Sequence, residues 1–164
     1  MRPATRPPAV RAIEPGDRAA LEPLAHDLWG THIVVGHGTV FEPATLAGFL
    51  AERDGRTVGL LTYVLDGDAL EIVTIDAFPP AAGTGTALMD AAVETARARG
   101  CRRVVLMTTN DNLDALRFYQ RRGFRIAAVR PGAVAAARAL KPQIPETGAY
   151  GIPLRDEIEL ERDV

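Results

Sequence analysis

Apolar and polar positions along the chain follow two periods, and each period predicts a kind of element. Between residues 48 and 78, three apolar segments are separated by the pairs Asp54-Gly55 and Asp66-Gly67. An Asp-Gly pair between apolar runs is a strong signal for a β-hairpin. The region is therefore predicted to form an antiparallel meander whose last strand covers about residues 69–78.

Apolar residues recur at helical spacing in four other segments. The predicted helices cover about residues 17–28, 86–99, 113–122 and 132–140. Asp17 and Asn112 are suitable N-caps, and Gly100 and Gly123 are placed to end two of the helices. The glycine-rich segment 30–38 predicts neither helix nor strand. Further short strands are predicted near residues 10–13, 102–109, 124–129 and 155–163.

The order of these elements predicts an α/β (α+β) fold with a mixed sheet. A strand, a helix and a second apolar strand in succession favour a right-handed crossover that joins parallel neighbours, while the meander pairs antiparallel. The 164 residues suffice for one domain with its own core. We therefore expect a single domain over residues 1–164, of which residues 1–9 are a loose, proline-rich tail.

Composition narrows the classes of function. The chain is 47% hydrophobic and 24% charged, with a net charge of −2, so no global field favours nucleic acid or an anionic membrane as a partner. No apolar run is long enough to span a bilayer, and the single cysteine, Cys101, is compatible with a reducing compartment. We expect a cytoplasmic protein. The spacing of His26, His32 and His37 matches no compact zinc pattern, so no metal is expected.

A glycine-rich turn, Gly83-Thr84-Gly85, comes after the long predicted strand and opens the helix at residues 86–99. Such a turn at a helix N-terminus can cradle phosphate with backbone N–H groups. It lacks the third small residue of a dinucleotide-binding loop, since Leu88 is at that position, and it lacks the Lys-Ser or Lys-Thr pair of a P-loop. Taken alone, it also fits a tight turn that binds no ligand.

A second motif favours a ligand-binding turn. Residues 112–124 have the pattern Asn-x-x-Ala-x-x-Phe-Tyr-x-x-x-Gly-Phe. Together with the segment FPPAAGTGTALM, this motif resembles the GNAT superfamily of acyl-CoA-dependent N-acetyltransferases. The resemblance implies a central, mostly antiparallel sheet of six to seven strands flanked by helices, with a parallel pair splayed around the CoA site. Pro80 departs from the family's pattern, because it stands where Gln or Arg is usual.

The resemblance also implies where acetyl-CoA, the co-substrate, would bind. Backbone amides of the glycine turn would hold the pyrophosphate, and the long strand together with Asn112 would line a wedge for the pantetheine arm. Either Arg121 or Arg122 would meet the CoA 3′-phosphate. The implied CoA-binding residues are Ile75, Asp76, Ala77, Ala82, Gly83, Thr84, Gly85, Thr86, Asn112 and Tyr119.

Two residues are the first candidates for catalysis. Tyr119 matches the family's tyrosine near the thioester sulfur, which acts as general acid; its alternative role is that of a core aromatic residue. Glu71 matches, by its place on the long strand, the glutamate that serves as base in the histone-acetyltransferase branch. Its alternative is a solvated residue on a half-buried strand. Asp76 and the glutamates of the closing strand are further candidates for the base.

The predicted function is transfer of an acetyl group from acetyl-CoA to a primary amine of a small molecule or a peptide. The amine would attack the thioester directly in a ternary complex, without an acyl-enzyme at Cys101. The alternative is a non-catalytic module of the same fold that senses acyl-CoA. A homodimer is left open as the assembly. The predicted walls of the acceptor pocket are Trp29, His32, His37 and Tyr150.

Overall fold

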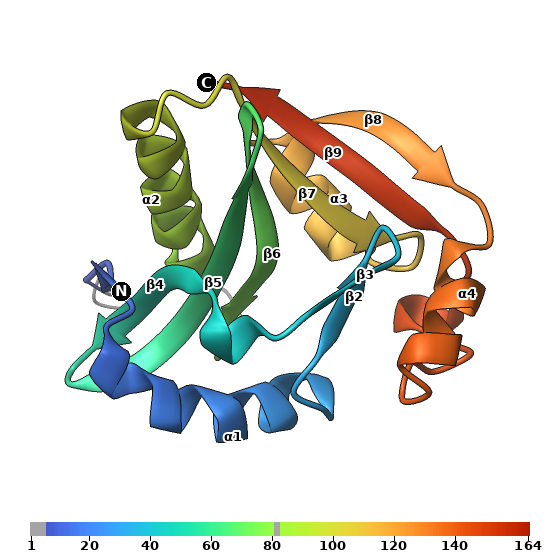
Figure 1. The fold of residues 1–164 in the computed structure, drawn as a ribbon, viewed down its shortest axis with the longest axis horizontal. Coiled ribbons are helices and arrows are strands. Elements are labelled where there is room, and N and C mark those ends of the chain that lie inside the picture. The colour runs from blue at the N-terminus through green and yellow to red at the C-terminus, as the bar shows by residue number, and fades with distance from the viewer. Residues whose placement is uncertain (1–5, 81–82) are drawn as a thin grey trace, which may run out of the picture.

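Two Asp-Gly turns build the centre of the fold, as the sequence predicts. The computed structural model describes residues 6–80 and 83–164. In it, β4 (Ala47–Arg53), β5 (Arg56–Asp66) and β6 (Ala69–Ala77) form an antiparallel meander (Figure 1). The glycines of the two turns have φ of 74° and 57°, a left-handed conformation that glycine adopts without steric cost. The predicted meander is therefore confirmed.

The meander belongs to a seven-stranded sheet with the order β1-β4-β5-β6-β7-β9-β8. The remaining helices and strands, in chain order, are β1 (Ala9–Ala12), α1 (Arg18–Trp29), β2 (Val34–Gly36), β3 (Thr39–Phe41), α2 (Thr84–Ala98), β7 (Arg103–Thr109), α3 (Leu113–Gln120), β8 (Arg125–Arg130), α4 (Ala133–Leu140) and β9 (Glu157–Asp163). Among the described residues, β6 and β7 form the one parallel pair of this sheet. The predicted mixed α/β sheet is thus confirmed.

The parallel strands β6 and β7 separate partway along their length. Their pairing runs from Ala69↔Arg103 to Ile72↔Leu106. Beyond that point β6 stays with β5 as far as Ala77, and β7 stays with β9. Each diverging strand therefore keeps its ladder on one side only, and the backbone groups on the facing edges need other partners. This wedge is a place where an extended, peptide-like ligand can bind.

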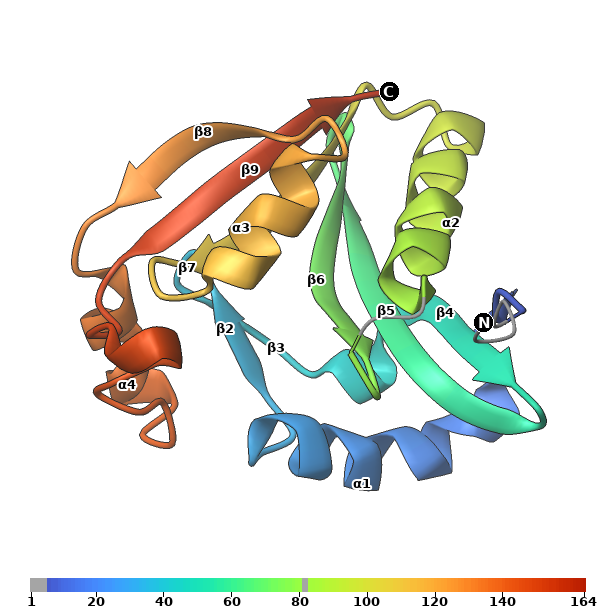
Figure 2. The same cartoon turned by 180° about the vertical axis from the view of Figure 1, so that it is seen from behind.

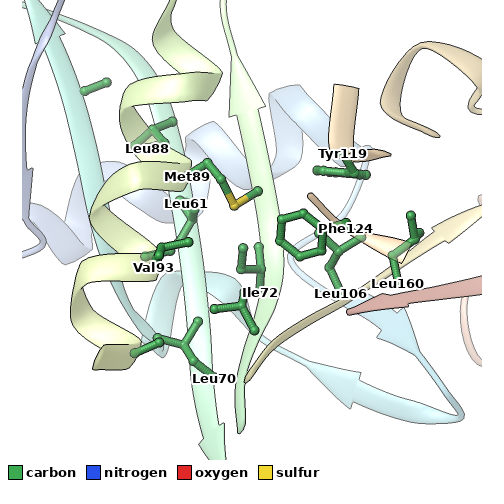
Figure 3. Close-up of a cluster of buried hydrophobic side chains, with 14 residues drawn as sticks. Leu61, Leu70, Ile72, Leu88, Met89, Val93, Leu106, Tyr119, Phe124 and Leu160 are labelled. Atoms are coloured by element: carbon green, nitrogen blue, oxygen red, sulfur yellow. The ribbon is translucent and has the colours of Figure 1, made fainter. Parts of the chain in front are cut away.

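Helices cover both faces of the sheet. α2 and α3 lie on the same face, on either side of β6 (Figure 2). The larger core lies on this face, where Leu70 and Ile72 of β6 pack with Met89 of α2 and Phe124 (Figure 3). On the opposite face, a smaller core holds α1 against β4 and β5. No helix in the described part of the chain combines the length and apolar character needed to cross a membrane.

The glycine-rich segment 30–38, for which the sequence predicts neither element, contributes to a small hairpin of β2 and β3. His37 occupies its turn with φ of 39°. The His37 backbone N–H donates to Oε2 of Glu157 at 3.0 Å, and its ring Nε2 lies 2.7 Å from Oε1 of Glu71. These contacts hold the hairpin across β6 and β9, in front of the sheet in Figure 1.

The N-terminal segment differs from the prediction in two details. The predicted loose tail is wrong for Ala9, which begins β1 and pairs with Glu52 at the edge of β4. Asp17 stands at the N-cap position of α1 but does not cap that helix with its side chain. Its carboxylate instead accepts hydrogen bonds from Arg11 and from the N–H of Glu14, because a 3₁₀ turn precedes the helix.

Gly59 allows the start of α2 to lie directly on β5. A methyl group at Gly59 would lie 2.5 Å from Cγ2 of Thr84 and 3.0 Å from Cδ1 of Leu88, and both of these side chains are fully buried. We expect Gly59→Ala to lower the free energy of unfolding by about 1–3 kcal/mol, the usual cost of overpacking a core. Urea denaturation measures the change. Gly16→Ala is the control, since its methyl group would meet nothing within 4 Å; equal stability of both variants would contradict the prediction.

Candidate active site

The N-terminus of α2 presents a set of open backbone donors. Gly83 is the N-cap, with φ of 78°, and the helix begins at Thr84, two residues before the predicted start. The first N–H groups of a helix have no partner within the helix. Together with the helix dipole they favour an anion. Ala82, which the sequence also assigns to this turn, lies outside the described residues.

The residues of the turn have different surroundings. The side chain of Thr84 is 1% exposed and packs onto β5 at Gly59, so only its main chain can face a ligand. Gly85 lies against α3, where a Cβ atom would be 3.1 Å from Cζ of Phe118. The absence of a side chain at Gly85 therefore lets α3 approach the N-terminus of α2.

A groove of about 590 Å³ runs between the N-terminus of α2 and one face of α3. Its α3 side carries three arginines and the carboxylate of Asp114, so positive charge predominates next to the helix N-terminus. This arrangement suits an extended anionic ligand. Six of the predicted CoA-binding residues line the groove, namely Ile75, Ala77, Gly83, Gly85, Thr86 and Tyr119.

Arg122 is the arginine of this groove that reaches the start of α2. Its Nη2 donates to Oγ1 of Thr86 at 2.5 Å, and its guanidinium carbon lies 3.6 Å from the centroid of the Phe118 ring. Its Nε is buried and has no hydrogen-bond partner among the described residues. A fixed guanidinium with an unused buried donor, beside open N–H groups, fits a phosphate group. Arg122 thus supplies a positive charge near Pro80, which lines the same groove.

The edge of β6 presents backbone donors to the wedge. The N–H of Phe78 donates to the carbonyl of Val58 on β5 at 2.9 Å. Because the backbone N–H groups of an antiparallel strand point alternately to one side and the other, the N–H groups of Ala77 and Ile75 point away from β5. Both residues line the groove, so a ligand in it can accept hydrogen bonds from this edge.

A second hollow, of about 220 Å³, opens from the wedge toward α1 and β2. It shares Ile75 and Tyr119 with the groove, so the two spaces meet at these residues. Asp76 and Asn112 also line the second hollow. Asn112 is in addition the N-cap of α3, since its Oδ1 accepts a hydrogen bond from the N–H of Ala115 at 3.3 Å. The predicted cap is therefore confirmed, and it is compatible with a place beside the ligand.

Tyr119 is built into the core next to this junction (Figure 3). It is 8% exposed, and its ring packs against those of Phe118 and Phe124, with centroids 5.5 and 5.8 Å away. Its hydroxyl has no hydrogen-bond partner among the described residues. Burial and, to a smaller extent, the charge of Asp76 raise the pKa of Tyr119 above its usual value. The phenol therefore keeps its proton at neutral pH and is available as a donor.

Asp76 is the carboxylate that faces the junction from β6. It is half-buried, and this loss of hydration raises its pKa to about 6, while a hydrogen bond with the Trp29 side chain acts in the opposite direction. At pH 8 the group is ionised, yet it is more basic than an ordinary carboxylate. These are the properties of a general base that works near neutral pH.

Glu71, the first candidate for the base from the sequence, lies in different surroundings. It is 8% exposed and lies against the ring of His37. It lines neither the groove nor the second hollow. The sequence around Glu71 does not reveal that this side chain is covered, because the hairpin that covers it comes from 34 residues earlier in the chain. The geometry therefore favours Asp76 over Glu71 as the base.

Of the four predicted acceptor-wall residues, the structure places Trp29 on the second hollow. His32 instead contacts the ring of His26, and the Tyr150 hydroxyl donates to Asp114 at 2.8 Å, beside the larger groove. Lys141, which directly follows α4, is a wall residue that the sequence analysis did not single out. No local signal could have found it, because a lysine after a helix is usually solvated.

Comparison with known proteins identifies the family of this chain and agrees with its fold. The model of the acetyltransferase (GNAT) family matches residues 17–124, so this chain belongs to the GNAT acetyltransferase family. Protein YdhI of Bacillus subtilis (strain 168) is 44% identical over 131 residues, which cover 79% of this chain and 82% of YdhI. Protein YxbD of the same strain is 39% identical over 137 residues, which cover 83% of this chain and 86% of YxbD.

Solved structures show the same fold. The IAA acetyltransferase from Bacillus cereus ATCC 14579 superposes with a TM-score of 0.70 at 21% identity, covering 95% of this chain and 99% of that one. A Bacillus subtilis acetyltransferase in complex with CoA superposes with a TM-score of 0.69 at 20% identity, covering 96% and 99%. At these identities the likeness concerns the fold alone.

Proposed function

We propose that this protein transfers the acetyl group of acetyl-CoA to a primary amine. The observation that carries the proposal is the meeting of two spaces at Tyr119. One is lined by the N-terminus of α2 and by Arg122, and the other by Asp76. The first space suits the nucleotide and pantetheine of CoA, and the second leaves room for an amine beside the thioester. Membership of the GNAT family supports the same assignment.

The proposed position of CoA follows from the open donors of the groove. The N–H groups of Gly85 and Thr86, with the guanidinium of Arg122, bind the pyrophosphate. The pantetheine amides then accept hydrogen bonds from Ile75 and Ala77 on the free edge of β6, as an added strand would. This path brings the thioester to Tyr119, at the far end of the groove from the phosphates.

In the proposed reaction, the amine nitrogen forms a bond to the thioester carbonyl carbon and the carbon–sulfur bond breaks. Asp76 accepts the proton that the nitrogen loses, directly or through one water. A backbone N–H of β6 stabilises the negative charge that develops on the carbonyl oxygen. Tyr119 donates its proton to the departing sulfur and regains one from solvent. The products are an N-acetylated amine and free CoA thiol.

The proposal includes no acetyl-cysteine intermediate. Cys101 follows the C-terminus of α2, and its N–H donates to the carbonyl of Ala96. The 15 residues of α2 place this end of the helix about 22 Å from the N-terminus, at a rise of about 1.5 Å per residue. A direct attack in a ternary complex needs no residue to carry the acetyl group.

A thiol-detecting assay tests the proposed function. With acetyl-CoA and a panel of primary amines, the purified protein should release CoA faster than hydrolysis does, and mass spectrometry should find the acetylated amine. When both substrates are varied, intersecting double-reciprocal lines are expected for a ternary complex and parallel lines for an acyl-enzyme. Tight binding of acetyl-CoA without turnover of any amine would contradict the proposal and support an acyl-CoA sensor.

Arg122→Ala is expected to raise the Kd for CoA about tenfold, or ~1.4 kcal/mol, because it removes the cation beside the α2 N-terminus. Calorimetry with CoA and with 3′-dephospho-CoA measures the loss. Equal weakening for both ligands places Arg122 at the pyrophosphate, whereas a loss confined to CoA places it at the 3′-phosphate. Arg97→Ala, in the last turn of α2, is the control that should leave Kd unchanged. An Arg122 variant that binds both ligands like the wild type would refute the assignment.

A further inference from the structure

The second hollow has charge of opposite sign on two of its walls. Among the described residues that line it, Asp76 is the one carboxylic acid and Lys141 is the one basic residue. Asp76 stands on β6 at the junction with the CoA groove, whereas Lys141 follows the last residue of α4, beside β2. Figure 2 shows α4 and β2 at the side of the molecule away from α2. A ligand in this hollow therefore meets an anion at one wall and a cation at another.

Lys141 is the one cationic residue among the described residues that line this hollow. It is the single lysine of the sequence, and its ammonium group has no hydrogen-bond or ion-pair partner among the described residues. Nearby Arg138, in contrast, donates to the carbonyls of Ile144, Pro145 and Leu154. Lys141 is half-buried, and burial lowers its pKa. An anion that binds in the hollow would relieve this cost of an unpaired, partly dehydrated charge.

We propose that Lys141 binds an anionic group of the acceptor, so that the substrate is a small primary amine that also carries a carboxylate or a phosphate. This inference rests on the proposed function, because it takes the second hollow as the acceptor site. The amine is directed to Asp76 and the thioester, and the anionic group to Lys141. Polyamines and aminoglycosides are disfavoured, since their additional ammonium groups would be repelled by Lys141.

The size and the other walls of the hollow agree with a small acceptor. Its volume is about 220 Å³, which is enough for a molecule of a few carbon atoms but below the usual size of a drug-like pocket. Trp29, Val34 and Met107 provide apolar surface, which suits a short carbon chain between the amine and the anionic group.

Matched pairs of acceptors test the inference by kinetics. The kcat/KM for 4-aminobutyrate is compared with that for butylamine, and the kcat/KM for phosphoethanolamine with that for ethanolamine. We expect the anionic member of at least one pair to be preferred tenfold or more; the pair that shows it identifies the anion as carboxylate or phosphate. A ratio near one in both pairs, or the best rate with spermidine, would overturn the inference.

Variants of Lys141 assign the preference to this residue. Lys141→Met keeps a chain of similar length without the charge and should reduce the ratio toward one, mainly through a higher KM for the anionic amine. Lys141→Arg should retain most of the preference. Arg155→Met removes an exposed charge from the same C-terminal loop, outside the hollow, and should leave the ratio unchanged. A ratio that Lys141→Met does not alter would overturn the inference.

A binding experiment separates this inference from the proposed function. Because the chain has a single lysine, protein labelled with [6-13C]lysine gives one ε-carbon NMR signal. With CoA present, 4-aminobutyrate or phosphoethanolamine should shift this signal, and butylamine should not. If no amine is acetylated but the anionic amines shift the signal, the anion site at Lys141 is supported and the enzymatic function fails. Absence of a shift with both anionic amines would overturn the inference even if other amines are acetylated.

Discussion

Replacement of Asp76 by Asn is expected to lower kcat/KM for amine acetylation at pH 8 by about 100-fold or more, the usual contribution of a general base. The amide keeps an oxygen that can accept a hydrogen bond from the Trp29 side chain, the partner of Asp76 in the folded protein, but it cannot take a proton from the attacking amine. The loss should therefore appear in the chemical step and not in the Kd for acetyl-CoA, which calorimetry measures.

The pH dependence provides a second test of the same assignment. Because burial raises the pKa of Asp76 to about 6, wild-type kcat/KM should fall as pH decreases through about 6, and the Asn variant should lack this limb. Glu71→Gln is the matched control on the same strand, and we expect it to retain most of the activity. A large loss in Glu71→Gln with little loss in Asp76→Asn would make Glu71 the base.

Asp76→Asn is also expected to stabilise the folded protein at pH 8. The pKa of Asp76 rises from an ordinary value near 3.8 to about 6 on folding, so the free energy of unfolding falls as pH increases through this window. Above pH 6 the carboxylate is ionised in both the folded and the unfolded state. The free energy of unfolding is then lower than at acidic pH, where the group is protonated in both states, by on the order of 2 kcal/mol. Asn lacks this cost. Denaturation of both proteins at pH 4 and pH 8 should show a gain for Asp76→Asn that is larger at pH 8.

Tyr119→Phe is expected to lower kcat about 100-fold, because the departing thiolate loses its proton donor. The ring contacts with Phe118 and Phe124 are retained, and the hydroxyl has no hydrogen bond to lose among the described residues. Thermal stability should therefore remain close to that of the wild type, and CoA should bind with similar affinity. Stopped-flow or steady-state CoA release with a good acceptor measures the rate.

Tyr63→Phe is the control for Tyr119→Phe. Tyr63 stacks on Phe49, with centroids 5.9 Å apart, and it lines neither the groove nor the second hollow. Its substitution should leave kcat unchanged. A Tyr119→Phe variant with the rate of the wild type would show that Tyr119 serves the core and that solvent protonates the thiolate.

The elements that the sequence predicted correctly are those with local causes. The Asp-Gly turns of the meander need a left-handed residue that glycine supplies, and Asn112 caps α3 with its own side chain. The two motifs around Gly83 and Tyr119 sufficed to predict the family, which the comparison confirms. These signals lie within a few residues of the structure that they specify, so they can be recognised along the chain.

The choice of Asp76 as the proposed base depends instead on long-range packing. Asp76 and Glu71 are both carboxylates of β6, and their sequence surroundings do not distinguish their environments. The β2–β3 hairpin covers Glu71 through His37, while the splay of β6 from β7 leaves Asp76 beside the junction of the two hollows. Burial raises the pKa of Asp76, which lies beside Trp29 of α1 in the second hollow.

The sequence by itself thus determined the order of the main helices and strands apart from the β2–β3 hairpin, the glycine turn at Gly83 and Gly85 as a candidate phosphate site, and the candidate acid Tyr119. The tertiary structure alone decided which carboxylate faces the junction, which arginine reaches the start of α2, and that Lys141 lines the second hollow. The physical reason is that hydration, charge pairing and cavity walls are properties of groups brought together from distant segments, and a single segment does not contain them.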